Sequence, residues 1–600
     1  MFVLLASVAC SDKKPPEEVK TYTNPLKLQL ADGNVAETCP DPAIIHSQTP
    51  GDDAWYLYCT SNPLNNQMDA AGKPVFHLLP IYSSKDLVDW AYVGDAFDSQ
   101  PAWAAAPQGF WAPDIQFFNG KYYLYYTASD TKVGGSAIGV ATSDSPAGPW
   151  TQAPAPVVEP QKPPCCVNDP NETRRRWVFD SNVVTGDDGQ RYLYFGSYFG
   201  GIAIRKLSAD GLSTDAASQK EIISDDIYEG AYIVKHDNYY YFFGSATNCC
   251  NGPLTGYSVF AGRSTSPMGP YVDRDGNPLT QGRVGGTPVI SMNGNRWVGP
   301  GHNSVFTDFA NQDWIVYHAI DRNDPYRLGK PQGDFSDKRH VLMDPLDWVD
   351  GWPTVRGGLW ASDEPIPAPA AQPKQKAHYT MTQQQPDEAG ALMATFSDDF
   401  TGPALGSQWT WVRPPATTTY GLESGTLRFD AQEGDLYKEI NTASVLTAAA
   451  PQGKNYIVET KVRMNVPAQG CCFNYTQAGL VIYGDDDNFI KLTPFALWNT
   501  RQIEFAKEQF PVPQDFPRYG NTVAGPPGED TWLRIAVRFV DGGETYTAYT
   551  SRDGTQWYRN GTWTHKLGNA RIGLVSMARA SDHPEFTAHF DYVHVYELNN

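Results

Sequence analysis

The stretch WAPDIQFFNGKYYLYYTAS, residues 111–129, decides the fold because its pattern returns along the chain. It contains an acid, Asp114, then a short apolar run, an Asn-Gly pair and an aromatic run that ends on small residues. Asn-Gly between two such runs predicts a β-hairpin. One hairpin alone says little about architecture, whereas a repeated one indicates a fold built from similar sheets.

Four further segments align with this one on a leading polar residue. Each combines a short apolar strand, a turn signal and an aromatic strand that closes on a small residue. The spacing leaves room for about four short strands per unit, which predicts an all-β, five-bladed β-propeller. The innermost strands of a propeller line a central channel, so we expect the leading side chains to meet at one of its mouths. These residues are Asp41, Asp114, Asp180, Glu229 and His302.

Acids gathered at one mouth suggest a reaction. Two carboxylates that face a sugar can hydrolyse a glycosidic bond, one protonating the leaving oxygen and the other activating water. An Asp at the start of a strand also often caps a turn, so any single member of the set can be structural.

The composition narrows the class of protein and its partners. The chain has 600 residues, enough for several domains, and a net charge of −21, which argues against nucleic acid as a partner. Aromatic residues make up 13% of it, and their rings suit both β-strands and stacking on sugars. No apolar run approaches the length of a membrane-spanning helix.

The N-terminus and the cysteines predict export. Residues 1–24 read as a lipoprotein-type signal and tether, in which Cys10 becomes lipidated, so the only membrane contact we expect is that anchor at the cell surface or in the periplasm. Eight further cysteines, six of them in adjacent pairs, have no zinc-site spacing and predict disulfides whose pairing stays open.

At this point the chain resembles glycoside hydrolase family 43, whose members are five-bladed propellers that release arabinose, xylose or galactose units by inversion. The resemblance covers residues 25–362 and rests on the repeated segments. Besides residues 111–129 they include PDPAII, FDSNVVTGDDGQRYLYFGS, EGAYIVKHDNYYYFFGS, GPGHNSVF and DPLDWVDGWPTV.

The resemblance implies roles for individual residues. Asp41 matches the general base and Glu229 the general acid, while Asp180 matches a third carboxylate whose negative charge raises the pKa of the acid and orients it. His302 matches a histidine beneath the site that in many members binds a central metal, often calcium, mostly through water. A structural calcium is therefore expected near His302, and no cofactor is expected for the chemistry. The expected substrate-binding residues are Asp114 and Trp111 together with one of two arginines, Arg322 or Arg339.

The rest of the chain predicts a second domain. Residues 363–392 are rich in Pro, Ala and Gln and read as a linker or strap. Residues 393–600 alternate strands and turns and resemble the concanavalin-A-like β-sandwich (jelly-roll) module of many family 43 enzymes. The segment GCCFNYTQ, residues 470–477, is the candidate for a loop that walls the active site. The acidic run at residues 485–487 favours a solvated hairpin turn over a calcium site.

These features favour an inverting, exo-acting α-L-arabinofuranosidase that acts on plant cell-wall oligosaccharides or polysaccharides. A β-D-xylosidase or an exo-β-galactosidase on the same scaffold stays open as an alternative. A third alternative, from another class, is a non-catalytic surface glycan-binding protein.

Overall fold

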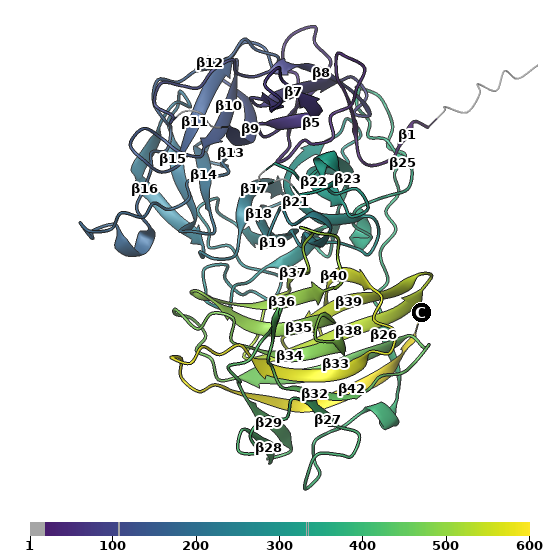
Figure 1. Cartoon of the computed structure of the whole chain (residues 1–600). Coiled ribbons are helices and arrows are strands. Elements are labelled where there is room, and N and C mark those ends of the chain that lie inside the picture. The colour runs from purple at the N-terminus through teal and green to yellow at the C-terminus, as the bar shows by residue number, and fades with distance from the viewer. Residues whose placement is uncertain (1–18, 106–108, 332, 334, 600) are drawn as a thin grey trace, which may run out of the picture.

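Five β-sheets arranged around a common axis form the N-terminal part of the protein, and a two-sheet sandwich follows (Figure 1). The structure is a computed structural model that describes residues 19–105, 109–331, 333 and 335–599. The predicted five-bladed β-propeller and the predicted C-terminal sandwich are both confirmed.

In every blade the innermost strand lies at the channel. The strands of the first three blades follow one another from the channel outward. Blade one comprises β3 (Ala43–His46), β4 (Trp55–Tyr58), β7 (Pro80–Ser84), β8 (Asp89–Asp95) and β2 (Lys27–Gln29). Blade two comprises β9 (Phe110–Phe118), β10 (Lys121–Ala128), β11 (Ala137–Ser143) and β12 (Thr151–Gln152). Blade three comprises β13 (Asn182–Thr185), β14 (Arg191–Ser197), β15 (Gly201–Leu207) and β16 (Thr214–Ile223).

The last two blades follow the same order. Blade four comprises β17 (Glu229–His236), β18 (Tyr239–Ala246), β19 (Ser258–Ser264) and β20 (Thr287–Ile290). Blade five comprises β21 (Trp297–Thr307), β22 (Asp313–Asp321), β23 (Arg339–Val349) and β24 (Trp352–Val355). A separate hairpin joins β5 (Asn62–Met68) to β6 (Pro74–His77), and the short 3₁₀ turns are η1 (Pro164–Cys166), η2 (Gly252–Leu254), η3 (Arg327–Gly329), η4 (Arg356–Gly358) and η5 (Ala394–Phe396).

The ring closes by packing and by contacts of the chain before β2 with blade five. The inner strands contact one another in the order β3, β9, β13, β17, β21 and back to β3. Asn24 donates to the carbonyl of Met343 at 3.1 Å and accepts from its N–H at 3.0 Å. β1 (Thr21–Tyr22) pairs with β25 (Ile366–Pro367), which lies in the segment that leaves blade five. The start and the end of the propeller are therefore held together.

One hydrogen bond is repeated between neighbouring blades where the chain enters the channel. Each blade has a residue with left-handed backbone just before its inner strand or within it, and in four blades the N–H of this residue donates to a polar side chain at or near the end of the second strand of the preceding blade. The four pairs are Asp41 to His318 at 3.2 Å, Ala112 to Thr60 at 2.7 Å, Asp180 to Thr127 at 2.9 Å and His302 to Ser245 at 2.8 Å.

Blade four departs from this pattern at Gly230, which has a φ of +62°. Its N–H donates to Asp180 at 2.9 Å, because Ser197, at the equivalent end of blade three, donates to Glu229 instead. A Cβ on Gly230 would come within 3.2 Å of the His302 ring, so glycine fits both the backbone and the space.

The repeat corrects the sequence alignment in blade two. Ala112, with a φ of +46°, occupies the place that Asp41 and Asp180 occupy in their blades. Asp114 lies two residues further along β9 and accepts from Asn182 at 3.1 Å and from the N–H of Val183 at 2.9 Å. It therefore joins blade two to blade three rather than leading its own blade into the channel.

The sandwich encloses the apolar core of the C-terminal domain between two sheets. Leu446, Leu480, Ile535 and Val593 are fully buried in it. One sheet runs β28 (Tyr420–Glu423), β29 (Thr426–Asp430), β42 (Thr587–Asn599), β33 (Tyr456–Met464), β38 (Asp530–Val540), β39 (Gly543–Ser551) and β40 (Tyr558–His565), with β26 (Glu388–Leu392) also on β42. The other runs β27 (Thr410–Val412), β32 (Val445–Ala449), β41 (Arg571–Met577), β34 (Gln477–Asp485), β35 (Asn488–Leu497), β36 (Thr500–Glu508) and β37 (Tyr519–Ala524), and β30 (Leu436–Tyr437) pairs with β31 (Ile440–Asn441).

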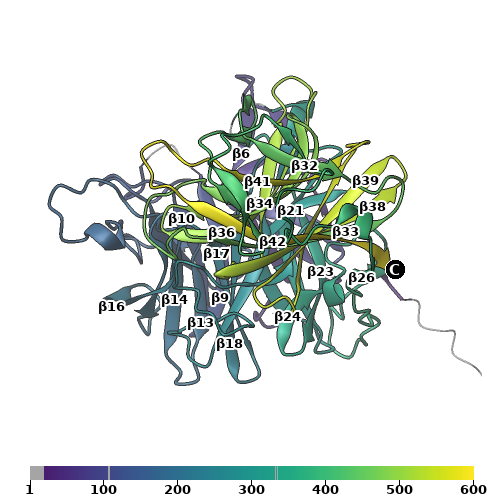
Figure 2. The same cartoon turned by 90° about the horizontal axis from the view of Figure 1, so that it is seen from below.

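The sandwich lies against the side of the propeller that blades four and five form, and Figure 2 shows it in front of the blades when seen from its own end. Backbone bonds cross the interface, from Arg501 to the carbonyl of Gly282 at 2.6 Å and from Thr562 to the carbonyl of Met292 at 2.9 Å. Arg552 also pairs with Asp273 at 3.1 Å. Shared backbone bonding and a buried ion pair fix the two domains to each other.

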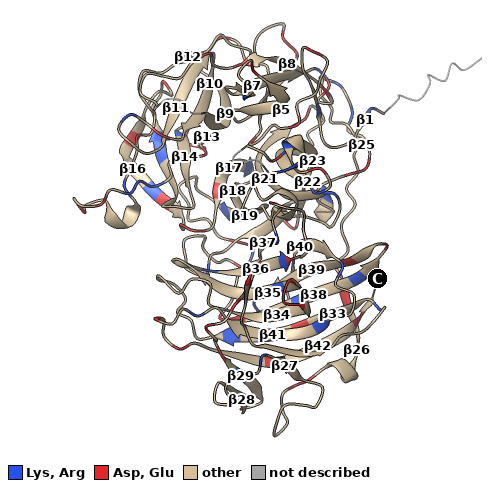
Figure 3. Cartoon of the chain, viewed as in Figure 1, with Lys and Arg blue, Asp and Glu red and all other residues tan. Residues whose placement is uncertain are grey.

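The structure also shows the cysteine pairs, the acidic run and the distribution of charged residues. The eight cysteines form disulfides Cys39–Cys59, Cys165–Cys166, Cys249–Cys250 and Cys471–Cys472. The acidic run lies at the turn between β34 and β35, where Arg413 pairs with Asp486 at 2.7 Å. Basic and acidic residues are interspersed over both domains (Figure 3).

The membrane-related expectations concern residues at the start of the chain. Cys10 and the expected signal fall outside the described residues, and the domain limits at residues 24, 362 and 392 stay predictions. Within the described part of the chain, no helix has the length and apolar character needed to span a membrane.

Candidate active site

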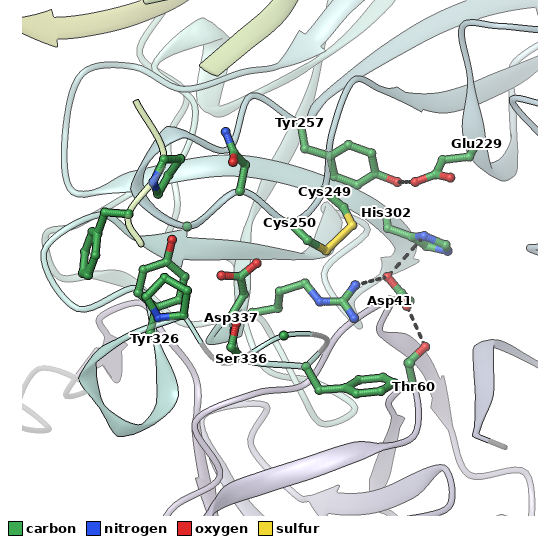
Figure 4. A pocket seen from close by; sticks show the side chains of 18 of the residues that line it. Asp41, Thr60, Glu229, Cys249, Cys250, Tyr257, His302, Tyr326, Ser336 and Asp337 are labelled. Atoms are coloured by element: carbon green, nitrogen blue, oxygen red, sulfur yellow. Dashed lines mark hydrogen bonds and ion pairs between the residues drawn. A yellow bond between two sulfur atoms is a disulfide. The ribbon is translucent and has the colours of Figure 1, made fainter. Parts of the chain in front are cut away.

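A cavity of about 860 Å³ opens at the channel mouth, and residues of all five blades contribute to its wall. Figure 4 shows Asp41, Glu229 and His302 on one side of it and Tyr326, next to a segment in the colour of the sandwich, on the other. Such a volume suits a ligand of a few sugar units. The propeller residues that line it include Asp41, Thr60, Trp111, Phe179, Asp180, Glu229, Tyr257, His302, Tyr326, Asp337 and Arg339.

Asp41 is held as an anion. Its Oδ2 accepts from the Thr60 hydroxyl at 2.6 Å, and its Oδ1 lies 3.4 Å from Nη1 of Arg339. Burial alone would raise the pKa of Asp41, but the surrounding positive charge and hydrogen bonds hold it well below its usual range. Burial also lowers the pKa of the adjacent His302 and His318, so both imidazoles are neutral at pH 7 and Arg339 is the lasting charge.

Glu229 is a carboxyl of the cavity wall that can carry a proton near neutral pH. Burial raises its pKa to about 7, and the negative charge of Asp41 adds to that rise. Two hydrogen bonds oppose it, one from the Tyr257 phenol to Oε1 at 2.7 Å and one from the Ser197 hydroxyl to Oε2 at 3.0 Å. Donors to a carboxylate favour its ionised form and so lower its pKa.

Asp180 and Glu229 form an interacting pair of buried carboxyls. Burial, and then the neighbouring Glu229, raise the pKa of Asp180 well above its ordinary value, although the Gly230 N–H donates to it. A buried carboxyl pair of this kind retains a proton that an exposed pair would lose. Because the repulsion between the two carboxyls is mutual, an ionised Asp180 favours the protonated form of Glu229, in addition to burial and the charge of Asp41.

The residues around His302 do not form a metal site made of protein ligands. Its Nδ1 lies 3.3 Å from Oδ1 of Asp41, whose charge Arg339 already offsets. No group of three or more His, Cys, Asp or Glu that could hold a metal ion occurs among the described residues. The expected calcium takes no part in the proposed reaction.

The expected substrate-binding residues separate into two groups. Trp111 and Arg339 line the cavity, and the Trp111 ring meets Phe179 edge-on with 5.5 Å between ring centroids. Asp114 and Arg322 do not line it. Asp114 is turned towards blade three, and Arg322 lies at the domain interface, where it donates to Thr564 of the sandwich.

The cavity also has lining residues that the sequence did not indicate. Thr60 donates to Asp41 and Tyr257 donates to Glu229, and the Cys249–Cys250 disulfide forms part of the wall (Figure 4). These residues occur in ordinary strand and loop sequence, without a motif that could have marked them.

The sandwich wall of the cavity is formed by a different segment from the expected one. It consists of Lys438 and residues 515–519, and Phe516 meets Tyr326 edge-on at 5.0 Å. The candidate loop at residues 470–477 does not line the cavity, so that hypothesis was wrong. Phe473 of that segment packs on Phe586 within the sandwich instead, with 5.2 Å between ring centroids.

Comparisons with known proteins give a family for each of the two domains. Residues 34–353 match the family model described as glycosyl hydrolases family 43, and residues 397–595 match a β-xylosidase C-terminal concanavalin A-like domain. The extracellular exo-α-(1→5)-L-arabinofuranosidase ArbA of Cellvibrio japonicus is 33% identical over 332 residues, which is 50% of this chain and 83% of that protein.

Two further similarities concern arabinan-acting proteins. The extracellular endo-α-(1→5)-L-arabinanase 1 of Bacillus subtilis is 31% identical over 46% of this chain and 79% of its own. The solved α-L-arabinanase of Cellvibrio cellulosa is 30% identical, with a TM-score of 0.42, over 53% of this chain and 95% of its own.

We predict that Tyr257→Phe shifts the basic limb of the kcat/KM profile to higher pH. The phenol stabilises ionised Glu229, so its loss raises the pKa of that carboxyl above the wild-type value of about 7. One hydrogen bond to a charged group corresponds to a shift of about one pH unit. The measurement is kcat/KM from pH 5 to about 9, the range over which such a group titrates.

Tyr198→Phe is the matched control. Tyr198 is a half-buried tyrosine near Glu229, but its phenol donates to the carbonyl of Thr247 at 2.6 Å. Its removal should leave the basic limb in place. A limb that stays unmoved in Tyr257→Phe, or moves to lower pH, would contradict the assignment of Glu229 as the group that must be protonated.

Proposed function

The chain belongs to glycosyl hydrolases family 43 and is a glycosidase, and from that premise we propose that it is an inverting, exo-acting α-L-arabinofuranosidase. One observation carries the proposal: a carboxylate held ionised and a carboxyl with a pKa of about 7 line the same cavity. An inverting hydrolase needs one group in each of these states at working pH.

In the proposed reaction Asp41 accepts a proton from a water molecule while that water attacks the anomeric carbon. Glu229 gives its proton to the departing glycosidic oxygen, so the bond to the leaving sugar breaks as the bond to water forms. Arg339 keeps Asp41 ionised and stays charged throughout. Asp180 acts as a positioning residue, because it bonds the N–H of Gly230, next to the acid.

The preference for arabinose rests on the similar proteins named above, which act on α-1,5-linked arabinan. Arabinose-containing polysaccharide of the plant cell wall is the proposed substrate, and export is supported by the extracellular descriptions of these relatives. A lipid anchor on Cys10 remains part of the proposal. A β-D-xylosidase is the second candidate, since the model that matches the sandwich is that of a β-xylosidase C-terminal domain.

The exo mode is supported by the position of the sandwich. Lys438 and residues 515–519 form one wall of the cavity, and Phe516 packs on Tyr326 of the propeller there. An endo-acting enzyme needs a groove in which a polymer can extend on both sides of the cleaved bond. A wall from a second domain leaves room for a chain end instead.

Asp41→Asn and Glu229→Gln should each lower kcat/KM on an arabino-oligosaccharide by about a thousandfold, as expected for loss of a general base or acid. On 4-nitrophenyl α-L-arabinofuranoside, Glu229→Gln should lose much less, since nitrophenolate departs without a proton, whereas Asp41→Asn should remain inactive. Initial rates on the two substrates separate these roles.

Asp114→Asn is the matched control, because it changes a buried carboxyl of the same propeller that does not line the cavity. It should leave kcat/KM close to that of the wild type. Equal losses of Glu229→Gln on both substrates would contradict its role as the acid, and circular dichroism checks that each variant is folded.

The first sugar released should have the opposite anomeric configuration to the substrate. A single displacement by water inverts the anomeric centre, whereas a glycosyl-enzyme intermediate would retain it. Proton NMR of the product, recorded before mutarotation, measures the outcome. Retention would mean that Asp41 acts as a nucleophile and would refute the proposed reaction.

Linear α-1,5-arabino-oligosaccharides should yield arabinose and a chain one unit shorter from the first minutes of reaction. Xylo-oligosaccharides and β-galactosides should react far more slowly. Chromatography of early products gives both answers. Arabinobiose and arabinotriose as first products from a long oligomer would contradict the exo mode, and faster release of xylose would favour the second candidate.

A further inference from the structure

A second cavity, of about 230 Å³, lies between the propeller and the sandwich. On the propeller side it is lined by residues of η2, β21 and the segment after β22, and on the sandwich side by β36 and β40. None of its lining residues lines the active-site cavity. It is therefore a separate space, formed only when the two domains are joined.

The charge in this cavity is one-sided. Arg322 comes from the propeller and Lys507 from the sandwich, and no Asp or Glu is found among the lining residues, all of which the structure describes. This is unexpected in a chain with a net charge of −21. Two cations placed together in a confined space repel each other unless an anion lies between them.

Lys507 has no hydrogen-bond or ion-pair partner for its ammonium group in the described part of the chain. Its side chain is 92% buried, since its exposed fraction is 8%. Buried charges in proteins are normally paired. By contrast Lys491, on the neighbouring strand β35, is also buried and pairs with Glu504 at 3.0 Å.

Further donors face the same space. The Thr564 hydroxyl accepts from Arg322, which leaves its own proton free to donate into the cavity. Asn323 and Gln509 also line it and carry amide N–H groups. A guanidinium, an ammonium, a hydroxyl and amides together resemble the donor sets that bind oxyanions.

We propose that this interdomain cavity is a binding site for a small tetrahedral oxyanion of the size of phosphate or sulfate, held between Arg322 of the propeller and Lys507 of the sandwich. The anion offsets both cations and bonds the two domains at once. The site is distinct from the glycosidase site, so the proposal does not depend on the substrate assigned there.

The surrounding charges fit this role. Burial, and then the charge of Arg322, lower the pKa of Lys507 to about 7, and a bound anion would restore its positive charge. His565 lies near Lys507, but burial lowers its pKa to about 4, so it is neutral at pH 7. Burial lowers the pKa of Arg322, whereas the negative charges of Asp321 and Asp363 raise it. Asp321 is already paired with Arg296.

The test measures the melting temperature of the full chain at pH 7 against increasing phosphate, with ionic strength kept constant by sodium chloride. Phosphate and sulfate should raise it along a saturation curve, because a ligand that binds only the folded state stabilises that state. Acetate should produce a clearly smaller rise. Phosphorus NMR line broadening measures phosphate binding directly.

Lys507→Met should weaken the apparent Kd for phosphate by about tenfold or more, as expected for loss of a charge-assisted contact. Lys566→Met is the matched control, since Lys566 is exposed nearby on the sandwich, and it should bind as the wild type does. Thr564→Val removes a hydroxyl without removing a charge, and its phosphate binding is a second test of the same site.

Three results would overturn the proposal. They are a wild-type protein that shows no saturable response to phosphate or sulfate, a Lys507→Met variant that responds as the wild type does, and an acetate response equal to that of phosphate. Since methionine replaces a buried cation with an apolar chain of similar length, Lys507→Met should fold. If it does not, loss of phosphate binding in Thr564→Val supports the site and unchanged binding there overturns it.

Discussion

The hydrogen bond that passes from one blade to the next organises the functional end of the propeller. An N–H at the start of an inner strand needs an acceptor once it is buried, and the preceding blade supplies it from a side chain. To reach that acceptor the backbone takes a left-handed conformation, which Asp41, Asp180 and His302 adopt although they are not glycines. Their side chains are thereby directed into one cavity, so the contacts that hold neighbouring blades together also place the residues of the site.

The protonation states of the three carboxyls in the cavity depend on this placement. Three carboxyls brought so close cannot all remain ionised in a poorly hydrated space. Arg339 favours the ionised form of Asp41, while burial favours the protonated forms of Glu229 and Asp180. The difference in protonation between Asp41 and the other two carboxyls therefore depends in part on the position of Arg339 beside Asp41.

The sequence predicted the repeat well because hairpin signals and aromatic strands are local properties, visible in any one unit. It did not predict the position of residues that depends on contacts between segments far apart in the sequence. Asp114 and Ala112 are two residues apart, and only the acceptor on Thr60 shows which of them takes the place of Asp41 and Asp180 in blade two. Arg322 and Arg339 are equally plausible in a linear reading, but one lies at the domain interface and the other beside Asp41. The sandwich wall at residues 515–519 carries no sequence signal at all, since its position depends on the docking of two domains.

The sandwich wall has a consequence for how the protein would work along a polymer. On the proposed exo mode, with residues 515–519 walling one side of the cavity, a released sugar and the remaining chain would leave through the same open side. The polymer would then withdraw before the sugar diffuses out, and a new end would have to enter. On the proposed exo mode the enzyme is thus distributive: it makes one cut per encounter, and its rate on long chains follows the number of chain ends rather than the total mass of polysaccharide.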